Sequence, residues 1–94
     1  MKFYVYMLMS KYKHIILSYV GYTNNIKKRI KDHNSSKGAK YTRGKKWIII
    51  YKKSYINKSL AMKNEYRLKK DRNLREKLKR NYLLKNENLS ITTI

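Results

Sequence analysis

Two aromatic-rich apolar segments, separated by a short polar stretch, occupy the start of the chain and constrain its fold more than any other feature. Residues 3–9 have the sequence FYVYMLM and residues 15–21 have IILSYVG, with the polar SKYKH between them. Segments of this length and composition are typical of β-strands, and the short connection predicts a hairpin. The second segment ends at Gly21, where a helical pattern takes over. We therefore expect a small sheet that starts from this hairpin.

Apolar side chains at helical spacing follow the hairpin. Ile26, Ile30 and His33 recur at i, i+4 and i+7, and Arg29 lies in the same stripe. The later pattern predicts a loop over residues 34–46, a strand over 47–55, a helix over 57–70 and a further helix from residue 73. The order strand, strand, helix, strand, helix, helix predicts an α+β domain.

One domain is expected over residues 1–85, because no linker, repeat or low-complexity segment divides them. From Asn86 onward the helical pattern fades. Residues 86–94 are therefore expected to form a C-terminal tail, with a short strand or a frayed end from Ser90.

Basic residues dominate the polar part of the chain. Lysine and arginine number 25 against 5 aspartate and glutamate residues, for a net charge of +20. Self-repulsion on this scale destabilises a compact fold, so the charge indicates a polyanionic partner. Nucleic acid is the first expectation, and an acidic membrane surface is the alternative.

Several classes of protein are disfavoured by what the chain lacks. It has no cysteine and two histidines, which argues against disulfides and against zinc sites built from these residues. Its apolar runs fall far short of the roughly 20 residues of a membrane span, and its first residues do not follow the pattern of a secretory signal. We expect an intracellular protein, in the cytoplasm or nucleus, that is not secreted and has no membrane partner.

Glu65 is the most informative single residue. It falls in the apolar stripe of the second predicted helix, between Ala61 and Leu68, where an unpaired carboxylate is costly. It therefore requires a cation. One candidate is an ion pair with a basic residue such as Lys69, and the other is a hard divalent ion such as magnesium, which commonly takes one or two carboxylates, waters and phosphate oxygens.

Tyr6 and Tyr19 lie on the two strands of the hairpin and are expected to project from one face of the sheet. Aromatic packing would account for them as well. A phenol is a poor base at its ordinary pKa near 10, but nearby cations lower that pKa and allow it to accept a proton from water. Structural and functional interpretations also stay open for Arg29 and His33.

Taken together and in order, these elements resemble the GIY-YIG nuclease family over about residues 2–80. The first motif of the family corresponds to residues 4–6 (YVY), with Tyr6 at the family tyrosine, and the second to residues 19–21 (YVG). Arg29 falls at the position of the helix arginine of the family, and His33 at its frequent histidine.

The downstream part of the chain carries two more points of resemblance. Residues 37–44 (KGAKYTRG) look like the loop of the small single-domain members and of the catalytic subunit of structure-selective resolvases. Ala61, Glu65 and Lys69 match the helix that carries the metal-binding glutamate of the family. Two departures are the missing glycine of the first motif and the missing proline before the third strand.

The resemblance implies a GIY-YIG nuclease-like fold with a small mixed three-stranded sheet and about three helices, and a metal-dependent hydrolysis of DNA phosphodiester bonds. Glu65 would bind the metal, Mg²⁺ or Mn²⁺, and Tyr6 would activate water, directly or through Tyr19. Arg29 would stabilise charge on the phosphate, and His33 would act as a supporting base or orienting group. The residues implied in DNA binding are Lys37, Lys40, Tyr41, Arg43, Lys45, Lys46 and Lys69.

The implied substrate is branched, flapped or otherwise distorted DNA in repair or recombination. No second domain is apparent in the sequence, so a protein partner for targeting and a homodimer with two active sites are both compatible with it. The alternative is a non-catalytic nucleic-acid-binding domain that keeps the nuclease fold. We expect the enzyme, because Tyr6, Tyr19, Arg29 and Glu65 are all present.

Overall fold

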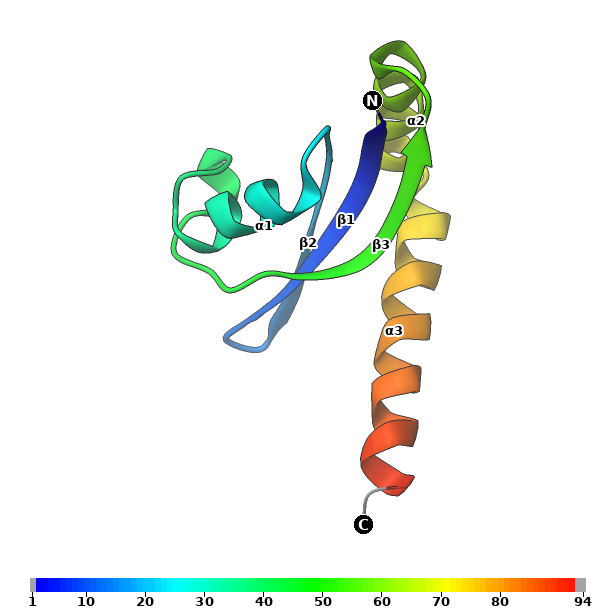
Figure 1. Ribbon diagram of the computed structural model, residues 1–94. Coiled ribbons are helices and arrows are strands. Elements are labelled where there is room, and N and C mark those ends of the chain that lie inside the picture. Colours follow the sequence, from blue (N-terminus) through cyan, green and yellow to red (C-terminus); the bar gives the residue numbers. More distant parts are fainter. Residues whose placement is uncertain (1, 93–94) are drawn as a thin grey trace.

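The computed structural model describes residues 2–92, with the side chains of residues 2–11 and 13–85. The elements are β1 (Phe3–Tyr12), β2 (Ile15–Thr23), α1 (Ile26–Asn34), the short 3₁₀ turn η1 (Lys40–Thr42), β3 (Ile48–Tyr55), α2 (Lys58–Lys70) and α3 (Arg72–Thr92). This is the predicted α+β order, as Figure 1 shows. The short strand predicted from Ser90 is wrong over residues 90–92, which belong to α3, and residues 93–94 lie outside the described part. The division at residue 85 stays a prediction.

The three strands form one sheet in the order β2-β1-β3. Both strand pairs are antiparallel, with Tyr6 opposite Gly21 in β2 and opposite Lys52 in β3. The expectation of a mixed sheet is thus corrected. β2 and β3 do run in the same direction, but β1 lies between them, so no two neighbouring strands are parallel.

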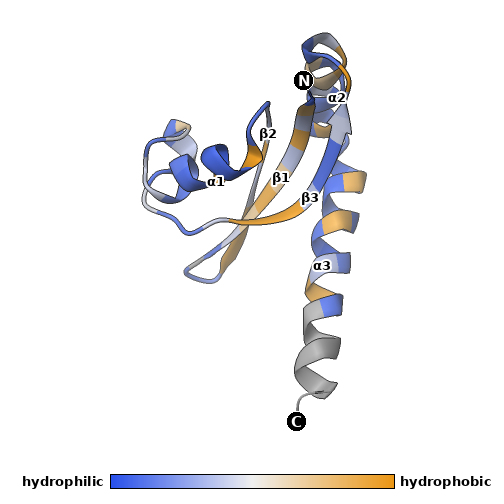
Figure 2. Cartoon of the chain, in the orientation of Figure 1, coloured by the Kyte–Doolittle hydropathy of each residue, from blue (hydrophilic) through white to orange (hydrophobic). Residues whose placement is uncertain are grey.

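Helices cover the two faces of the sheet with separate apolar clusters. On one face, Val5, Met7 and Val20 pack against Ala61 and Leu68 of α2. Strand alternation turns the neighbouring side chains of β1 to the other face, where α1 covers the sheet. The hydrophobic colour in Figure 2 accordingly follows β1 and the first part of β3, whereas α1 is mostly hydrophilic.

The cluster on the α1 face is built around Tyr6, Leu8 and Trp47. Ile26 and Ile30 of α1 pack against it, as the helical spacing predicts. This face also holds His33, so α1 carries its histidine into the interior of the protein.

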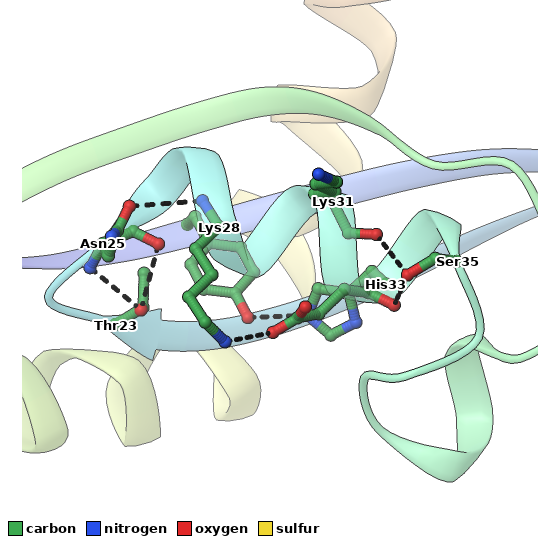
Figure 3. A network of polar contacts seen from close by, with 8 residues as sticks. Thr23, Asn25, Lys28, Lys31, His33 and Ser35 are labelled. Atoms are coloured by element: carbon green, nitrogen blue, oxygen red, sulfur yellow. Dashed lines mark hydrogen bonds and ion pairs between the residues drawn. The ribbon is translucent and has the colours of Figure 1, made fainter.

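Local side-chain contacts fix where α1 begins. The carboxamide of Asn25 accepts a hydrogen bond from the backbone of Lys28, and the hydroxyl of Thr23 accepts one from the backbone of Asn25. Figure 3 shows both contacts at the start of the helix, with His33 near its other end. Capping by Asn25 satisfies an otherwise free amide of the first turn.

The loop between α1 and β3 is anchored at its base. The Asn34 side chain donates to the Trp47 carbonyl at 3.1 Å and accepts from the Trp47 backbone at 2.6 Å. The indole of Trp47 donates to the Thr42 carbonyl at 2.9 Å. These three bonds hold the middle of the loop against the sheet, next to His33. Among the helices of residues 2–92, none has the length and apolar character required to cross a membrane.

Candidate active site

A chain of buried hydrogen bonds joins β1, α1 and the loop. The Tyr6 hydroxyl lies 2.8 Å from Nε2 of His33, and Nδ1 of His33 lies 2.9 Å from the Thr42 hydroxyl. That hydroxyl in turn donates to the Ala39 carbonyl at 2.8 Å. Tyr6, His33 and Thr42 are all fully or almost fully buried.

The order of donors along this chain assigns the protonation of His33. A carbonyl oxygen can only accept, so the Thr42 proton is committed to Ala39 and Nδ1 of His33 carries its own hydrogen. Burial, with the nearby Arg29 charge, holds the pKa of His33 below its ordinary value, so the ring stays neutral. Nε2 is then a free acceptor for the proton of the Tyr6 hydroxyl.

Arg29 lies close enough to the same hydroxyl for its guanidinium to lower the pKa of Tyr6. Burial nevertheless raises the pKa of Tyr6 to about 12, because desolvation of the phenolate outweighs the guanidinium. The sequence-based expectation that cations would lower this pKa is therefore wrong for the protein alone. Tyr6 is a neutral phenol whose proton points at a neutral imidazole.

Two glycines permit this close packing. A Cβ on Gly21 would lie 2.5 Å from the Tyr6 hydroxyl oxygen and 2.7 Å from Cζ of the same ring. A Cβ on Gly38 would collide with Nδ1 of His33. Glycine at these two positions allows the Tyr6 and His33 side chains to lie directly against the backbone.

Tyr19 extends the site toward solvent. Its ring lies 6.5 Å from that of Tyr6 and 5.0 Å from that of His33, so both hairpin tyrosines project from one face as predicted. Tyr41, from the loop, stacks on Tyr19 at 6.3 Å with its ring nearly parallel and is half exposed. The aromatic rings thus lead from the buried Tyr6 hydroxyl to the surface.

Glu65 reaches the site from the other layer. The helix that carries it, α2, packs on the opposite face of the sheet, yet the negative charge of Glu65 acts on Tyr6 and helps to raise its pKa. Its carboxylate is 18% exposed and lies 3.5 Å from the Lys69 ammonium. The sequence left an ion pair with Lys69 and a metal ion as alternatives, and the structure contains the ion pair.

The residues present fit a hard divalent ion only if waters and substrate phosphate oxygens supply most of its ligands. Among the side chains that the structure describes, those of residues 2–11 and 13–85, no group of three or more His, Cys, Asp or Glu converges. Glu65 has a carboxylate that is open to solvent on one side and only loosely held by Lys69. A single carboxylate with waters and substrate phosphate oxygens matches the way Mg²⁺ is commonly held.

The predicted DNA-binding residues divide into two groups. Tyr41, Lys45 and Lys69 lie at the site, since Lys45 donates to the Tyr41 carbonyl and lies over its ring, and Lys69 pairs with Glu65. The others are exposed to solvent along the loop, namely Lys37, Lys40, Arg43 and Lys46. On the other side of Arg29, a hollow of about 720 Å³ is lined by Lys28, Asp32 and Lys58 among others.

The sequence analysis missed Thr42, which ends the hydrogen-bonded chain, and Gly38, which lets the loop approach His33. Both lie in the loop segment that was assigned to DNA binding. Their positions gave no periodic signal, since only the fold brings the loop back onto α1.

The fold is that of a GIY-YIG domain. The family model described as the GIY-YIG catalytic domain matches residues 2–81, and the chain belongs to this family of nucleases. Within it, the chain is similar to proteins named UPF0213. One from Oceanobacillus iheyensis is 48% identical over 67 residues, which cover 70% of this chain and 74% of the relative.

Further relatives carry the same name. A UPF0213 protein of Clostridium perfringens is 42% identical over 87 residues, which cover 90% of each chain. A solution NMR structure of a UPF0213 protein from Bacillus halodurans is 40% identical and covers 83% of this chain and 82% of its own, with a TM-score of 0.48.

Proposed function

We propose that this protein is a divalent-metal-dependent endonuclease that hydrolyses DNA phosphodiester bonds, with branched or distorted DNA as its substrate. The observation that carries the proposal is the buried chain from Tyr6 through His33 to Thr42. The charges of Arg29 and Glu65 act on its Tyr6 end. A merely structural tyrosine does not require a neutral histidine acceptor and a guanidinium at one oxygen atom. The net charge of +20 supports a DNA partner.

The proposed chemistry uses Tyr6 as a proton relay. A water molecule gives a proton to the Tyr6 oxygen while the phenol passes its own proton to Nε2 of His33, so no phenolate is formed. The hydroxide attacks the phosphorus atom, the bond from phosphorus to the leaving oxygen breaks, and that oxygen takes a proton from solvent. This route is consistent with a Tyr6 pKa of about 12, which makes a free phenolate unavailable at neutral pH.

Arg29 has two roles in this scheme. It donates hydrogen bonds to the scissile phosphate and stabilises the charge that develops there. It also links substrate binding to the basicity of His33, because the Arg29 charge is one cause of the lowered pKa of His33. A phosphate paired with Arg29 offsets that charge and makes His33 a better acceptor.

Glu65 would hold the divalent ion, and Tyr19 would help to position the water. GIY-YIG nucleases in general depend on divalent metals. Such an ion, when bound, neutralises charge on the phosphate and on the leaving oxygen. A function in DNA repair or recombination, with a targeting partner or a second copy of the chain, follows from this substrate class.

Cleavage of labelled DNA structures, intact duplex, flaps and four-way junctions, with Mg²⁺ or Mn²⁺ tests the proposal. We expect cleavage by the wild type and loss of cleavage in Glu65→Gln. Circular dichroism checks that Glu65→Gln is folded, because this variant also loses the 3.5 Å contact with Lys69. If the wild type binds these DNA structures but cuts none of them, the enzyme hypothesis fails and the protein is a non-catalytic nucleic-acid-binding domain.

A further inference from the structure

Two hollows are lined by residues of β2, the edge strand of the sheet, together with residues of α3. The first has a volume of about 240 Å³ and is lined by Ser18, Tyr19, Val20, Tyr41, Lys69 and Arg75. The second, of about 230 Å³, is lined by Ile16 of β2 and by five residues of α3, Glu76, Lys79, Arg80, Leu83 and Leu84. We call the two together the β2–α3 groove.

The lining residues of the two hollows follow the same strand and the same helix. Ile16, Ser18 and Val20 alternate along β2 and therefore share one face of the strand. Arg75, Lys79 and Leu83 recur at i, i+4 and i+8 along α3 and share one face of the helix. Figure 1 shows α3 running past the hairpin turn, next to β3 in this view. The lining residues bring α3 close to β2 at Ser18 and at Ile16.

The groove starts at the candidate active site. Tyr19 and Tyr41, which stack on each other, form its first wall, and Lys69 is the residue paired with Glu65. Its walls carry four basic side chains and one carboxylate, a net charge of +3, in a domain that is basic throughout. Aromatic rings for stacking followed by a line of cations are typical of grooves that hold single-stranded nucleic acid.

We propose that the β2–α3 groove holds the DNA strand that leaves the active site, as an unpaired strand. This inference rests on the proposed function and adds a substrate feature to it, a single-stranded segment next to the scissile phosphate. The eight helical steps from Arg75 to Leu83 rise about 12 Å along the helix, which corresponds to at most about three stacked nucleotides. The hollows are far too small for a duplex, and Ile16 with Leu83 offers an apolar contact for a base at the far end.

Lys79 and Arg80 are the residues that test the groove, because neither belongs to the catalytic cluster. Arg75 is less suitable, since it donates to the Leu68 carbonyl at 2.8 Å and so caps the end of α2. The test variant is Lys79→Gln with Arg80→Gln, which keeps much of each aliphatic stem. Its control is Lys77→Gln with Lys85→Gln, which removes the same charge from two exposed positions of α3 outside the groove.

Binding of a fluorescein-labelled oligothymidylate, measured by anisotropy in EDTA at several salt concentrations, gives the first readout. Each phosphate contact on a single strand contributes about 0.7 to the slope of log affinity against log salt. We expect the slope of the groove variant to fall by about 1.4 and that of the control to stay near the wild-type value. Equal slopes for the two variants, with both folded by circular dichroism, would overturn the proposal.

The second readout is cleavage of substrates whose single-stranded segment is lengthened by one nucleotide at a time. The wild-type rate should rise over the first three nucleotides or so, and the rate of the groove variant should not. If no substrate is cut while EDTA binding still depends on Lys79 and Arg80, the nuclease proposal fails and the groove stands. If the groove variant cuts and binds as the wild type does, the groove alone is refuted.

Discussion

Replacement of Gly21 by alanine is the smallest change that should displace Tyr6. The added Cβ would lie 2.5 Å from the Tyr6 oxygen and 2.7 Å from Cζ, where ordinary contacts are about 3.5–4.0 Å. The ring must therefore retreat by about 1 Å. It is 1% exposed and has no free space in which to do so without disturbing its 2.8 Å bond to His33.

The expected cost has two parts. Overpacking of a buried site costs about 1–3 kcal/mol, and a buried polar group that loses its partner costs about 1–3 kcal/mol. Gly21→Ala should thus lose about 2–6 kcal/mol of the free energy of unfolding, against a total of about 5–14 kcal/mol for a domain of this size. Urea denaturation followed by the fluorescence of Trp47, the single tryptophan, measures this loss.

The same displacement should lower the single-turnover cleavage rate by about 100-fold, because a 1 Å error in placing a reacting group has an effect of that size. Gly44→Ala is the control. Gly44 has φ +74° with nothing within 4 Å of a Cβ, so the variant should lose about 1–2 kcal/mol and keep its cleavage rate. In a Tyr6→Ala background, Gly21→Ala should cost much less, because only the 3.2 Å contact of the Cβ with Cε2 of Tyr19 remains. A Gly21→Ala protein as stable and active as the wild type would refute the described packing of Tyr6.

Three further predictions follow from the same contacts. Thr42→Val removes the partner of His33 Nδ1, so it should lower the free energy of unfolding by about 1–3 kcal/mol in urea denaturation and slow cleavage. Thr42→Ser keeps the hydroxyl and should retain both stability and rate. A Thr42→Val protein that cleaves at the wild-type rate would exclude the relay. The pKa of Tyr6 is about 12 in the folded state and near 10 in the unfolded state, so its contribution to stability is present below pH 10 and is lost between about pH 10 and 12. Urea denaturation at a series of pH values should show a steeper alkaline loss of stability for the wild type than for Tyr6→Phe. Parallel curves for the two proteins would contradict the burial of Tyr6. Tyr41→Ala, at a half-exposed ring stacked on Tyr19, should weaken oligonucleotide binding about 5- to 100-fold with little change in stability, and unaltered binding would remove Tyr41 from the DNA path.

Much of the fold could be predicted because the chain has strong periodic signals. The hairpin strands are two apolar, aromatic-rich segments with a short polar connection, and Ile26, Ile30 and His33 mark one face of a helix, so these elements were confirmed. Strict alternation failed in β3. There a bulge pairs Met7 with Tyr51 but Leu8 with Ile49, and Ile50 and Tyr51 both pack on the α2 side. The position of a bulge cannot be predicted from a run of isoleucines, because every residue of the run is equally apolar.

The candidate site could be predicted as a set of residues but not as a geometry. Tyr6, Tyr19, Arg29 and His33 do converge, because the hairpin register and α1 place them on one face. The raised pKa of Tyr6 could not be foreseen, since it depends on how completely the fold removes water from the phenol. The role of Thr42 could not be predicted either, because Thr42 meets His33 only after the loop folds back onto α1.

The central claim is that the Tyr6 hydroxyl moves a proton during DNA hydrolysis. Single-turnover cleavage by Tyr6→Phe tests it most directly, because this change removes one oxygen atom and leaves the ring in place. We predict that the rate falls by about 100- to 10,000-fold while the affinity for DNA is unchanged. A Tyr6→Phe protein that cuts DNA at the wild-type rate would contradict the relay.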